Sequence, residues 1–428
     1  MARAMKDSGI EWIGEIPEGW EVARISSCFS EIKEKNTDSL YDNALQFKMG
    51  RIIPKPRKWD AEEIGETYSA YTIVHPGTIM VNGLNLEFDF VTQRVAIVEE
   101  NGIITSAYIA MSPNDSVDAD YMCYLLKAYD YRRALHNMGK GLRKILNYSE
   151  LKTKPILLPP LSEQRFIVKV LNAECARIDA VIEQTRTSIE EYKKLKQSVI
   201  TQAVTKGIRP GRKMKDSGVE WIGEIASLFY VFRLKHLLRA PLQYGANESG
   251  ILFENNLPRY IRITDISLDG KLKASGALSL TEETAKGYIL SNNDILFARS
   301  GATVGKAFIY KTEYGRAAFA GYLIRATVNE KIEPEFLFLY TQSSIYEEWK
   351  KQIFVQATIQ NIGADRYSEL PVVLPPIEEQ QEVIRYLNDR LREIDRLIER
   401  KEKLLTEIET YKKSLIFEYV TGKKEVPE

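Results

Sequence analysis

The chain contains two copies of one sequence unit, and this internal repeat constrains the fold more than any other feature. The segment MKDSGIEWIGEI at residues 5–16 returns as MKDSGVEWIGEI at residues 214–225, with a single substitution. Further along each copy, the junction LPPLSEQ at residues 158–164 matches LPPIEEQ at residues 374–380. Repetition at a fixed period predicts a chain built from two structural units, each of about 210 residues.

Each copy has the same internal order, in which a Trp-bearing leader precedes about 130 residues of mixed pattern, a Leu-Pro-Pro junction and a long helix. The mixed regions differ much more between the copies than the flanking segments do. Runs rich in β-branched and aromatic residues at 94–98, 260–266 and 322–328 predict strands, while 120–137 and 334–353 predict helices. The sequence therefore predicts the α/β class, mixed α+β, with one globular domain in each copy.

The helices that follow the two junctions have apolar residues alternately three and four positions apart. Proline pairs in the junctions prevent either helix from extending upstream. Such an alternation is typical of a coiled-coil seam, and we expect the two helices to pair with one another rather than pack inside separate domains. The predicted seam residues are Leu171, Ile178, Ile182, Ile189, Leu387, Leu391, Ile394, Ile398, Leu405 and Ile408. Antiparallel pairing would place the two globular domains at opposite ends and create a pseudo-twofold axis within one chain.

Composition restricts the class of protein without identifying a function. The 428 residues carry 59 Lys+Arg and 59 Asp+Glu, so any surface for a polyanion has to be local. Hydrophobic residues make up 44% of the chain, which excludes wholesale disorder. No apolar run reaches the ~18 residues needed to cross a bilayer, there is no signal-peptide pattern, and Cys28, Cys123 and Cys175 show neither disulfide nor zinc spacing. We expect a soluble, cytoplasmic, multi-domain protein.

These features together resemble one known family. The repeated leader, the LPPLxEQ and LPPIxEQ junctions, the order of shared and divergent segments and RSGATVGK at residues 299–306 are similar to the specificity subunit of type I restriction–modification enzymes, over essentially the whole chain. The resemblance implies two target-recognition domains, each reading one half of a gapped, asymmetric site on double-stranded DNA. It also implies that the helices form an antiparallel spacer that recruits two methyltransferase subunits, with restriction–translocase subunits joining outside.

The same resemblance implies no catalytic residue, metal or cofactor in this chain. S-adenosylmethionine is expected on the methyltransferase partner, and ATP with Mg on the restriction partner. The expected segments are a leader with the first target-recognition domain (1–157), the first shared helix with a linker (158–213), the second leader with the second recognition domain (214–373) and the second shared helix (374–428).

The two copies differ at two places near the leader. IPEGW at residues 16–20 is replaced by IASLF at residues 225–229, which keeps an aromatic residue, Trp20 or Phe229, whose role the sequence leaves open. Residues 1–4 precede what resembles the family's start at Met5, and the sequence also leaves open whether they are native.

The first mixed region holds an unbalanced basic segment at residues 48–58. Pro54 and Pro56 keep this stretch extended. Clustered Lys and Arg beside an aromatic residue favour contacts to DNA phosphate and sugar, although solvated charge runs are common on any surface. The candidate DNA-binding residues are Lys48, Arg51, Lys55, Arg57, Lys58 and Trp59, with a weaker group at Lys140, Arg143 and Lys144.

The second mixed region offers two candidate groups. Residues 259–265 alternate as a strand would, so that Arg262 and Thr264 share a face and can bind base edges, yet a half-exposed strand with an internal Arg–Asp pair explains them equally well. The glycine-rich stretch 299–306 has three residues between its glycines, not the four of a Walker loop. It therefore indicates either a turn beside a polyanion or an ordinary surface hairpin tip. The candidates are Arg259, Arg262, Thr264, Asp265, Arg299, Ser300, Thr303 and Lys306.

Catalysis has little support in the sequence. The Asn/Asp-Pro-Pro-aromatic motif of an adenine methyltransferase is absent, and His75, His136 and His236 lack a nucleophile or metal-ligand spacing around them. We therefore expect a non-catalytic DNA-recognition subunit. Two alternatives remain, namely a DNA-modifying enzyme with an unrecognised active site and a scaffold whose two domains bind proteins.

Overall fold

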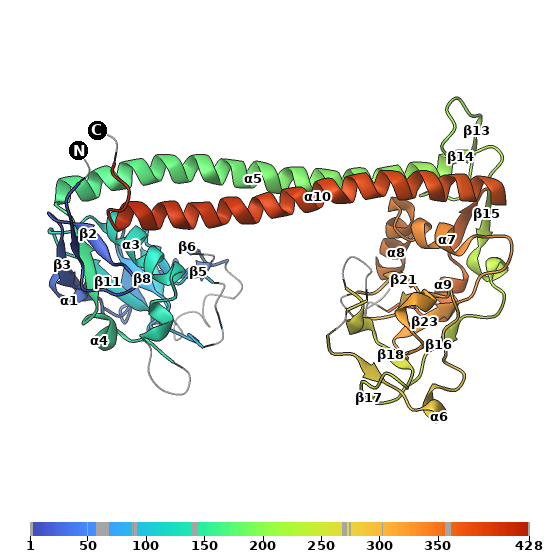
Figure 1. The fold of residues 1–428 in the computed structure, drawn as a ribbon, viewed down its shortest axis with the longest axis horizontal. Coiled ribbons are helices and arrows are strands. Elements are labelled where there is room, and N and C mark those ends of the chain that lie inside the picture. The colour runs from blue at the N-terminus through green and yellow to red at the C-terminus, as the bar shows by residue number, and fades with distance from the viewer. Residues whose placement is uncertain are drawn as a thin grey trace. The chain divides into compact units, whose positions relative to one another are not determined.

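The computed structural model describes residues 3–48, 50–56, 68–87, 89, 92–138, 144–267, 272–273, 275–301, 303–355 and 361–426. The chain forms two compact units (Figure 1). Unit 1 comprises residues 1–186 and 403–428, and unit 2 comprises residues 187–402. Each unit contains one leader, one mixed region and one segment of each long helix.

The long helices are α5 (Leu161–Lys206) and α10 (Ile377–Val420). The other elements of unit 1 are β1 (Met5–Asp7), β2 (Glu15–Pro17), β3 (Glu21–Arg24), α1 (Ile25–Cys28), β4 (Phe29–Glu31), β5 (Leu45–Lys48), β6 (Arg51–Pro54), β7 (Thr72–Val74), β8 (Ile79–Val81), β9 (Val95–Ile97), β10 (Gly102–Ile104), β11 (Ile109–Pro113), α3 (Ala119–Tyr131), η1 (Leu135–Asn137), α4 (Tyr148–Leu151) and β12 (Pro155–Leu158).

The elements of unit 2 begin and end as those of unit 1 do and differ in between. They are β13 (Met214–Asp216), β14 (Glu224–Ala226), β15 (Tyr230–Arg233), η2 (Leu234–Leu237), β16 (Gln243–Tyr244), β17 (Ile251–Leu252), β18 (Arg259–Ile261), η3 (Ile263–Asp265), β19 (Leu278–Ser279), α6 (Glu282–Ala285), β20 (Ile295–Ala298), β21 (Ala307–Ile309), η4 (Thr312–Tyr314), β22 (Ala317–Phe319), β23 (Leu323–Ala326), α7 (Pro334–Tyr340), α8 (Ser344–Val355), α9 (Ala364–Ser368) and β24 (Pro371–Leu374).

A four-stranded antiparallel sheet of the same connectivity lies in each mixed region. Its strand order is β4-β11-β8-β9 in unit 1 and β16-β23-β20-β21 in unit 2. The strands outside this sheet differ, because unit 1 adds the pairs β7–β10 and β5–β6, whereas unit 2 adds the sheet β17-β19-β18-β22, in which β18 and β22 run parallel. The mixed α+β class is therefore confirmed, and the units differ mainly in the strands that lie outside the shared sheet.

The predicted elements are present with shifted bounds. The strand expected at residues 260–266 is wrong beyond Ile261, because the chain turns there into η3. The helix expected at 334–353 is two helices, α7 and α8, separated at Thr341–Ser343, where the Ser343 hydroxyl donates to the carbonyl of Tyr340 at 2.6 Å. A serine that bonds to nearby backbone in this way competes with helix continuation.

The repeated leader folds as the same hairpin in both units. Met5 pairs with Pro17 across β1 and β2, and Met214 pairs with Ala226 across β13 and β14. Gly14 and its counterpart Gly223 have φ of +74° and +68°, a backbone conformation that L side chains rarely adopt. This requirement explains why the turn sequence is the same in both copies.

In unit 1 the leader is joined to the start of α5 through Glu163. Its carboxylate accepts from the Arg3 guanidinium at 2.6 Å and from the Trp20 indole at 3.1 Å. The guanidinium also lies 5.7 Å from the centre of the Trp20 ring, which is fully buried. Trp20 and Arg3 are thus part of the folded frame of the unit.

In unit 2 the same junction is made by Glu379, Arg212 and Phe229. Arg212 lies 2.5 Å from the Glu379 carboxylate and 5.4 Å from the centre of the buried Phe229 ring. The correspondence shows that Arg3 takes the position in unit 1 that Arg212 takes in unit 2. The aromatic residue retained in both leaders is the platform for this arginine.

The glutamine of each junction connects the long helix to the mixed region. The Gln164 amide donates to the carbonyl of Pro159 at 2.9 Å and accepts from the Asp118 N–H at 2.8 Å. Gln380 repeats both bonds, donating to the carbonyl of Pro375 at 2.9 Å and accepting from the N–H of Glu333 at 2.8 Å. Asp118 and Glu333 are the N-cap residues of α3 and α7. The glutamine of each junction therefore connects the start of the long helix to the proline pair and to the start of a helix in the mixed region.

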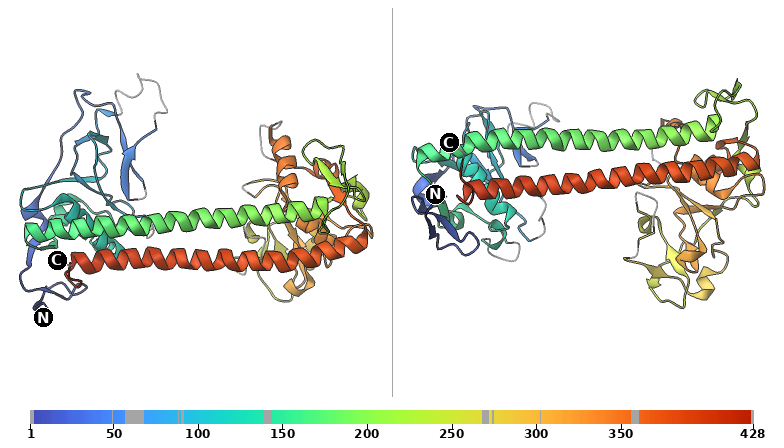
Figure 2. Two further views of the ribbon diagram at one scale, coloured as in Figure 1. Left: turned by 90° about the horizontal axis from the view of Figure 1, so that it is seen from above. Right: turned by 45° about the horizontal axis from the view of Figure 1, so that its top comes forward.

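The predicted helix pairing is confirmed within each unit. In unit 1, Asp179 faces Lys412 and Arg186 faces Glu409; in unit 2, Lys196 faces Asp395. Increasing numbers on α5 match decreasing numbers on α10, so the segments run antiparallel, as Figures 1 and 2 show for each unit. The seam residues Leu171, Ile178, Ile182, Ile189, Leu387, Leu391 and Ile394 are buried, and Ile398, Leu405 and Ile408 are half-buried. None of the helices in the described parts of the chain is both long and apolar enough for a membrane span.

Candidate nucleic-acid interface

The basic segment of unit 1 includes the hairpin formed by β5 and β6. Lys48 and Arg51 are paired residues at its turn, and both side chains are exposed, as is Lys55 after β6. Gly50 holds the turn at φ +73°, and a Cβ there would lie 2.6 Å from the Gln93 side chain. The turn therefore packs closely on the domain and displays its cations outward.

The remaining candidates of unit 1 are only partly covered by the structure. Lys144 is exposed and has a positive φ of 40°. Arg57, Lys58, Trp59, Lys140 and Arg143 lie outside the described residues.

The first candidate group of unit 2 is largely engaged within the protein. The prediction that Arg262 and Thr264 share a strand face is wrong, because β18 ends at Ile261. Arg262 donates to the buried carboxylate of Asp265 at 2.8 and 3.0 Å, and this hydrogen bond raises the pKa of the guanidinium. Arg259 donates to the carbonyl of Lys273, and burial lowers its pKa. Thr264 remains exposed.

The glycine-rich turn after β20 packs against α8 at Gly305. Gly305 has φ +82°, and a Cβ there would lie 2.2 Å from the Lys350 side chain. Its carbonyl accepts from the Tyr346 hydroxyl at 2.6 Å. Side chains of Tyr346 and Lys350 thus contact the turn at its second glycine. Thr303 and Lys306 of this turn are half-buried.

Arg299, at the end of β20, is the centre of a group that we call the Arg299 cluster: Tyr244, Arg299, Tyr322 and Asn361. The guanidinium carbon lies 4.9 Å from the centre of the Tyr244 ring. The Arg299 N–H donates to the carbonyl of Tyr322 at 3.0 Å, and the side chain of Tyr322 is 62% exposed. Ser300 forms a β-bridge with Asn361, which is also exposed.

Three strand ends and one loop bring this cluster together. Tyr244 comes from β16, Arg299 from β20, Tyr322 from the turn before β23, and Asn361 from the segment before α9. The sequence pattern indicates Arg299 and Ser300 but gives no signal for either tyrosine. The chain has 23 tyrosines, and only strand register distinguishes these two from the rest.

The long helices expose a second kind of surface. On α10, Leu397, Leu404 and Tyr411 are spaced by seven residues and are exposed. On α5, Val181 and Leu195 are exposed as well. We call these five residues the apolar flank.

The pairing of the helices locates the apolar flank relative to the ion pairs. Since Asp179 faces Lys412 in unit 1, the neighbouring positions Val181 and Tyr411 lie along one side of the seam. In unit 2, Leu195 and Leu397 have the same relation beside Lys196 and Asp395. Each unit therefore exposes an equivalent apolar pair. The other side of the seam carries charged contacts such as Arg186–Glu409.

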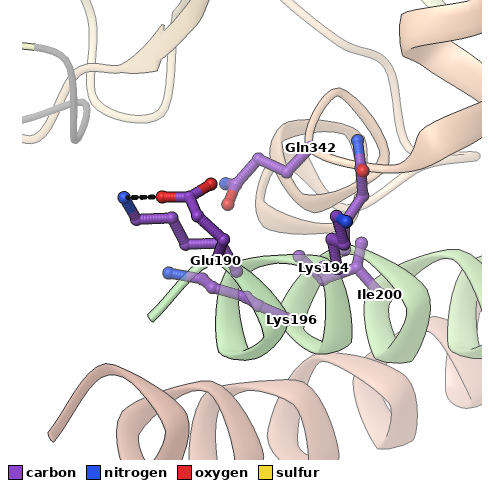
Figure 3. Close-up of a pocket in the computed structure, with 7 residues that line it drawn as sticks. Glu190, Lys194, Lys196, Ile200 and Gln342 are labelled. Atoms are coloured by element: carbon purple, nitrogen blue, oxygen red, sulfur yellow. Dashed lines mark hydrogen bonds and ion pairs between the residues drawn. The ribbon is translucent and has the colours of Figure 1, made fainter. Parts of the chain in front are cut away.

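Unit 2 has a hollow of about 380 Å³ where α5 passes the loop after α7 (Figure 3). Glu190 on its edge accepts from Lys193 at 2.9 Å, and Lys194, Lys196 and Gln342 complete the polar rim. The Glu190 carboxylate is thus engaged by Lys193, and the other lining residues are lysines, amides and Ile200.

Unit 1 has a larger hollow, of about 750 Å³, between α3, α5 and the end of α10. Cys123 and Cys175 line it, and burial raises the pKa of both thiols, which disfavours the reactive thiolate. The described residues contain no group of three or more His, Cys, Asp or Glu arranged to hold a metal ion.

The comparisons with known proteins all name one kind of protein. A family model described as the type I restriction modification DNA specificity domain matches residues 254–410, a range that includes Arg299. The type I restriction enzyme MjaVIII specificity subunit of Methanocaldococcus jannaschii is 25% identical over 95% of this chain and 93% of its own length. The putative MjaX specificity subunit of the same organism is 26% identical over 96% of this chain and 95% of its own.

One solved structure shares the fold over almost the whole chain. It belongs to work on complex assembly and conformational transition of the type I R-M system, and it superposes with a TM-score of 0.71. It covers 96% of this chain and 99% of its own at 15% identity, so the likeness concerns the fold.

Proposed function

The chain belongs to the family of type I restriction–modification specificity subunits, and from that premise we propose that it recognises a gapped, two-part DNA site and recruits the subunits that modify or cut it. The observation that carries the proposal is the contrast within the repeat. The leader hairpins, the junction glutamine bonds and the Asp–Lys pairs between the helices repeat in both units, while the strands outside the shared four-stranded sheet differ. Two domains that share their supporting elements but differ in their outer strands suit a DNA site whose two halves have different sequences.

In this proposal, residues 1–157 and 214–373 are the two target-recognition domains, and residues 158–213 and 374–428 are the shared helices with their linker. The Lys48–Arg51 hairpin contacts phosphates of one half-site, together with the neighbouring basic residues predicted from the sequence. Such contacts make affinity salt-dependent without adding sequence information. Base edges of the other half-site meet the Arg299 cluster.

The apolar flank is the proposed docking surface for methyltransferase. An exposed row of large apolar side chains beside a charged row is typical of a protein-binding helix face. Because each unit exposes an equivalent pair, the same partner surface is accommodated twice, which fits two methyltransferase subunits. Restriction–translocase subunits join that assembly from outside.

We assign no catalytic step to this chain. S-adenosylmethionine belongs to the methyltransferase partner, and ATP with Mg to the restriction partner. The buried thiols of unit 1 and the packed glycine-rich turn of unit 2 support this assignment over that of a stand-alone DNA-modifying enzyme. The proposed location of the assembly is the cytoplasm, where its DNA substrate is.

The test is co-expression with the neighbouring methyltransferase subunit in an unmethylated host, followed by long-read mapping of modified adenines. We expect one gapped motif whose first half changes when residues 20–157 are exchanged for those of a relative, and whose second half changes when 229–373 are exchanged. A formed complex that yields no methylation would favour the scaffold alternative. Methylation by this chain without the partner would contradict the non-catalytic assignment.

A further inference from the structure

The guanidinium of Arg299 has donors that the protein does not use. Among the described residues no carboxylate or carbonyl accepts from this side chain, and its Nε is buried without a partner. Arg262 in the same unit is different, since three of its side-chain hydrogen bonds go to Asp265 and the carbonyl of Gly276. The two terminal nitrogens of Arg299, Nη1 and Nη2, are neither buried nor paired within the described residues, so they are available to an acceptor from outside.

Tyr244 fixes the plane of this guanidinium. The ring lies 4.9 Å from the Arg299 guanidinium carbon, and its hydroxyl accepts from the Ala364 N–H at 2.9 Å. The backbone of Tyr244 pairs with Ile324 in the shared sheet. An arginine stacked on a fixed ring keeps its fork of donors in one orientation, so less entropy is lost when a planar ligand binds.

The residues around Arg299 point to a nucleobase rather than to phosphate alone. Tyr322 exposes an aromatic ring and Asn361 an amide on segments whose backbones pair with those of Arg299 and Ser300, and both side chains are uncharged. An aromatic ring packs on bases or on the thymine methyl group, and an amide pairs with base edges. A site for phosphate alone has no need of either group.

We infer that Arg299 reads a guanine in the DNA half-site of unit 2 by donating to its O6 and N7, with Tyr244 as the positioning residue and Tyr322 beside the adjacent base. The inference rests on the proposed function, since it names the base recognised by that site. Bidentate pairing of arginine with these two atoms is the commonest specific base contact.

The first experiment uses the complex of this chain with methyltransferase and compares methylated motifs of variants. For the unaltered complex we expect a guanine in the half-site assigned to residues 229–373. Arg299→Ala should relax that one position and leave the other half-site unchanged. Tyr244→Phe, which keeps the ring, should retain the motif, while Tyr244→Leu should weaken selection at the same position. Arg316→Ala is the matched control, since this exposed arginine of unit 2 is engaged by Glu282.

The second experiment tests whether Arg299 contacts N7 of the recognised guanine. Replacing the recognised guanine by 7-deazaguanine removes N7, and affinity should fall by about 5- to 150-fold for the unaltered complex. With Arg299→Ala, the 7-deazaguanine substitution should lower the affinity little further, because the side chain that donates to N7 is already absent. Gel filtration of each complex verifies that the variants assemble.

The outcomes separate the inference from the proposed function. If no two-part motif is found, the proposed function fails. A two-part motif that lacks guanine in the second half, or one that Arg299→Ala leaves intact, overturns only the inference. If Arg299→Ala weakens the affinity equally for every DNA sequence and makes that affinity less dependent on salt, Arg299 is a phosphate contact. That result would also overturn the inference.

Discussion

The ammonium of Lys412 donates to both carboxylate oxygens of Asp179, at 2.6 and 2.7 Å, and so joins the last part of α10 to the first half of α5. The internal repeat exchanges the two helices in unit 2, where Lys196 of α5 donates to Asp395 of α10 at 2.6 and 2.9 Å. Each copy of the sequence unit thus carries both an acid and a base on its own helix, and each pairs with the opposite charge on the other helix. An antiparallel pair is the arrangement in which two copies of such a unit satisfy each other.

Reversing the Asp179–Lys412 pair tests this complementarity. Asp179→Lys alone places two cations together and should lower the free energy of unfolding by about 0.5–1 kcal/mol, since the pair is partly exposed. Adding Lys412→Asp should restore most of the loss. Urea unfolding of the complex with methyltransferase measures the free energy of unfolding of the single and the double variant. Arg177→Ala, which removes an exposed pair within α5, is the control with little expected effect.

Removal of the leader arginine should destabilise unit 2 more than unit 1. In Arg212→Ala the Glu379 side chain, only 6% exposed, loses its cation, whereas Arg3→Ala leaves Glu163 at 19% exposure and still bonded to Trp20. A buried carboxylate without its partner costs about 3–5 kcal/mol, and a more exposed one costs less. Thermal unfolding should give the larger decrease for Arg212→Ala. Equal decreases would contradict the burial argument, and Lys6→Ala, at an exposed leader position, is the control.

Polar substitutions on the apolar flank should reduce methyltransferase binding one site at a time. Tyr411→Ser with Val181→Ser alters the pair in unit 1, and Leu195→Ser with Leu397→Ser alters the pair in unit 2. Each double variant should shift the assembly from two bound methyltransferase subunits towards one, as measured by native mass spectrometry. Leu252→Ser replaces another exposed leucine, away from the helices, and should leave two subunits bound. Unchanged stoichiometry in both double variants would exclude this docking surface.

The hairpin cations of unit 1 should contribute affinity without selectivity. Lys48→Ala and Arg51→Ala should each weaken binding to all DNA sequences and reduce the slope of log K against log salt by about 0.9. Fluorescence anisotropy at several salt concentrations gives the slope. Lys33→Ala provides the comparison, because this exposed lysine is paired with Glu31. A change in the methylated motif would show instead that the hairpin reads bases.

The buried Asp130 should make stability depend on pH. Burial raises the pKa of its carboxyl, so the folded state holds the proton at pH values where the unfolded state has released it. Its contribution therefore decreases as pH rises from the ordinary Asp value of about 3.9 to the raised folded value, and is constant above it. Relative to Asp130→Asn, the unaltered chain should lose unfolding free energy over that interval. A parallel pH profile for the two proteins would contradict the raised pKa.

Much of the frame was predictable because local pattern and repetition carry the information. Proline pairs, the spacing of Leu171, Ile178 and Ile182, and the matched junctions were sufficient for the two helices and for their seam. The Glu-Gln pair of each junction was recognisable as a repeat, but the contacts that it makes in the fold were not. The contacts of Glu163 with Arg3 and Trp20 join residues that lie far apart in the chain, and no local pattern encodes them.

The sequence by itself determined the duplicated architecture, the mixed class of each unit and the heptad seam, since these follow from periodicity and from residues close together in the chain. Only the tertiary structure decided which arginines are available to a ligand. Arg262 and Arg299 look alike in the sequence, yet one is engaged by Asp265 after β18 ends early, and the other is stacked on Tyr244 with donors unused. Whether a charged side chain is engaged within the protein depends on its neighbours in space, and strand register and turns set those neighbours.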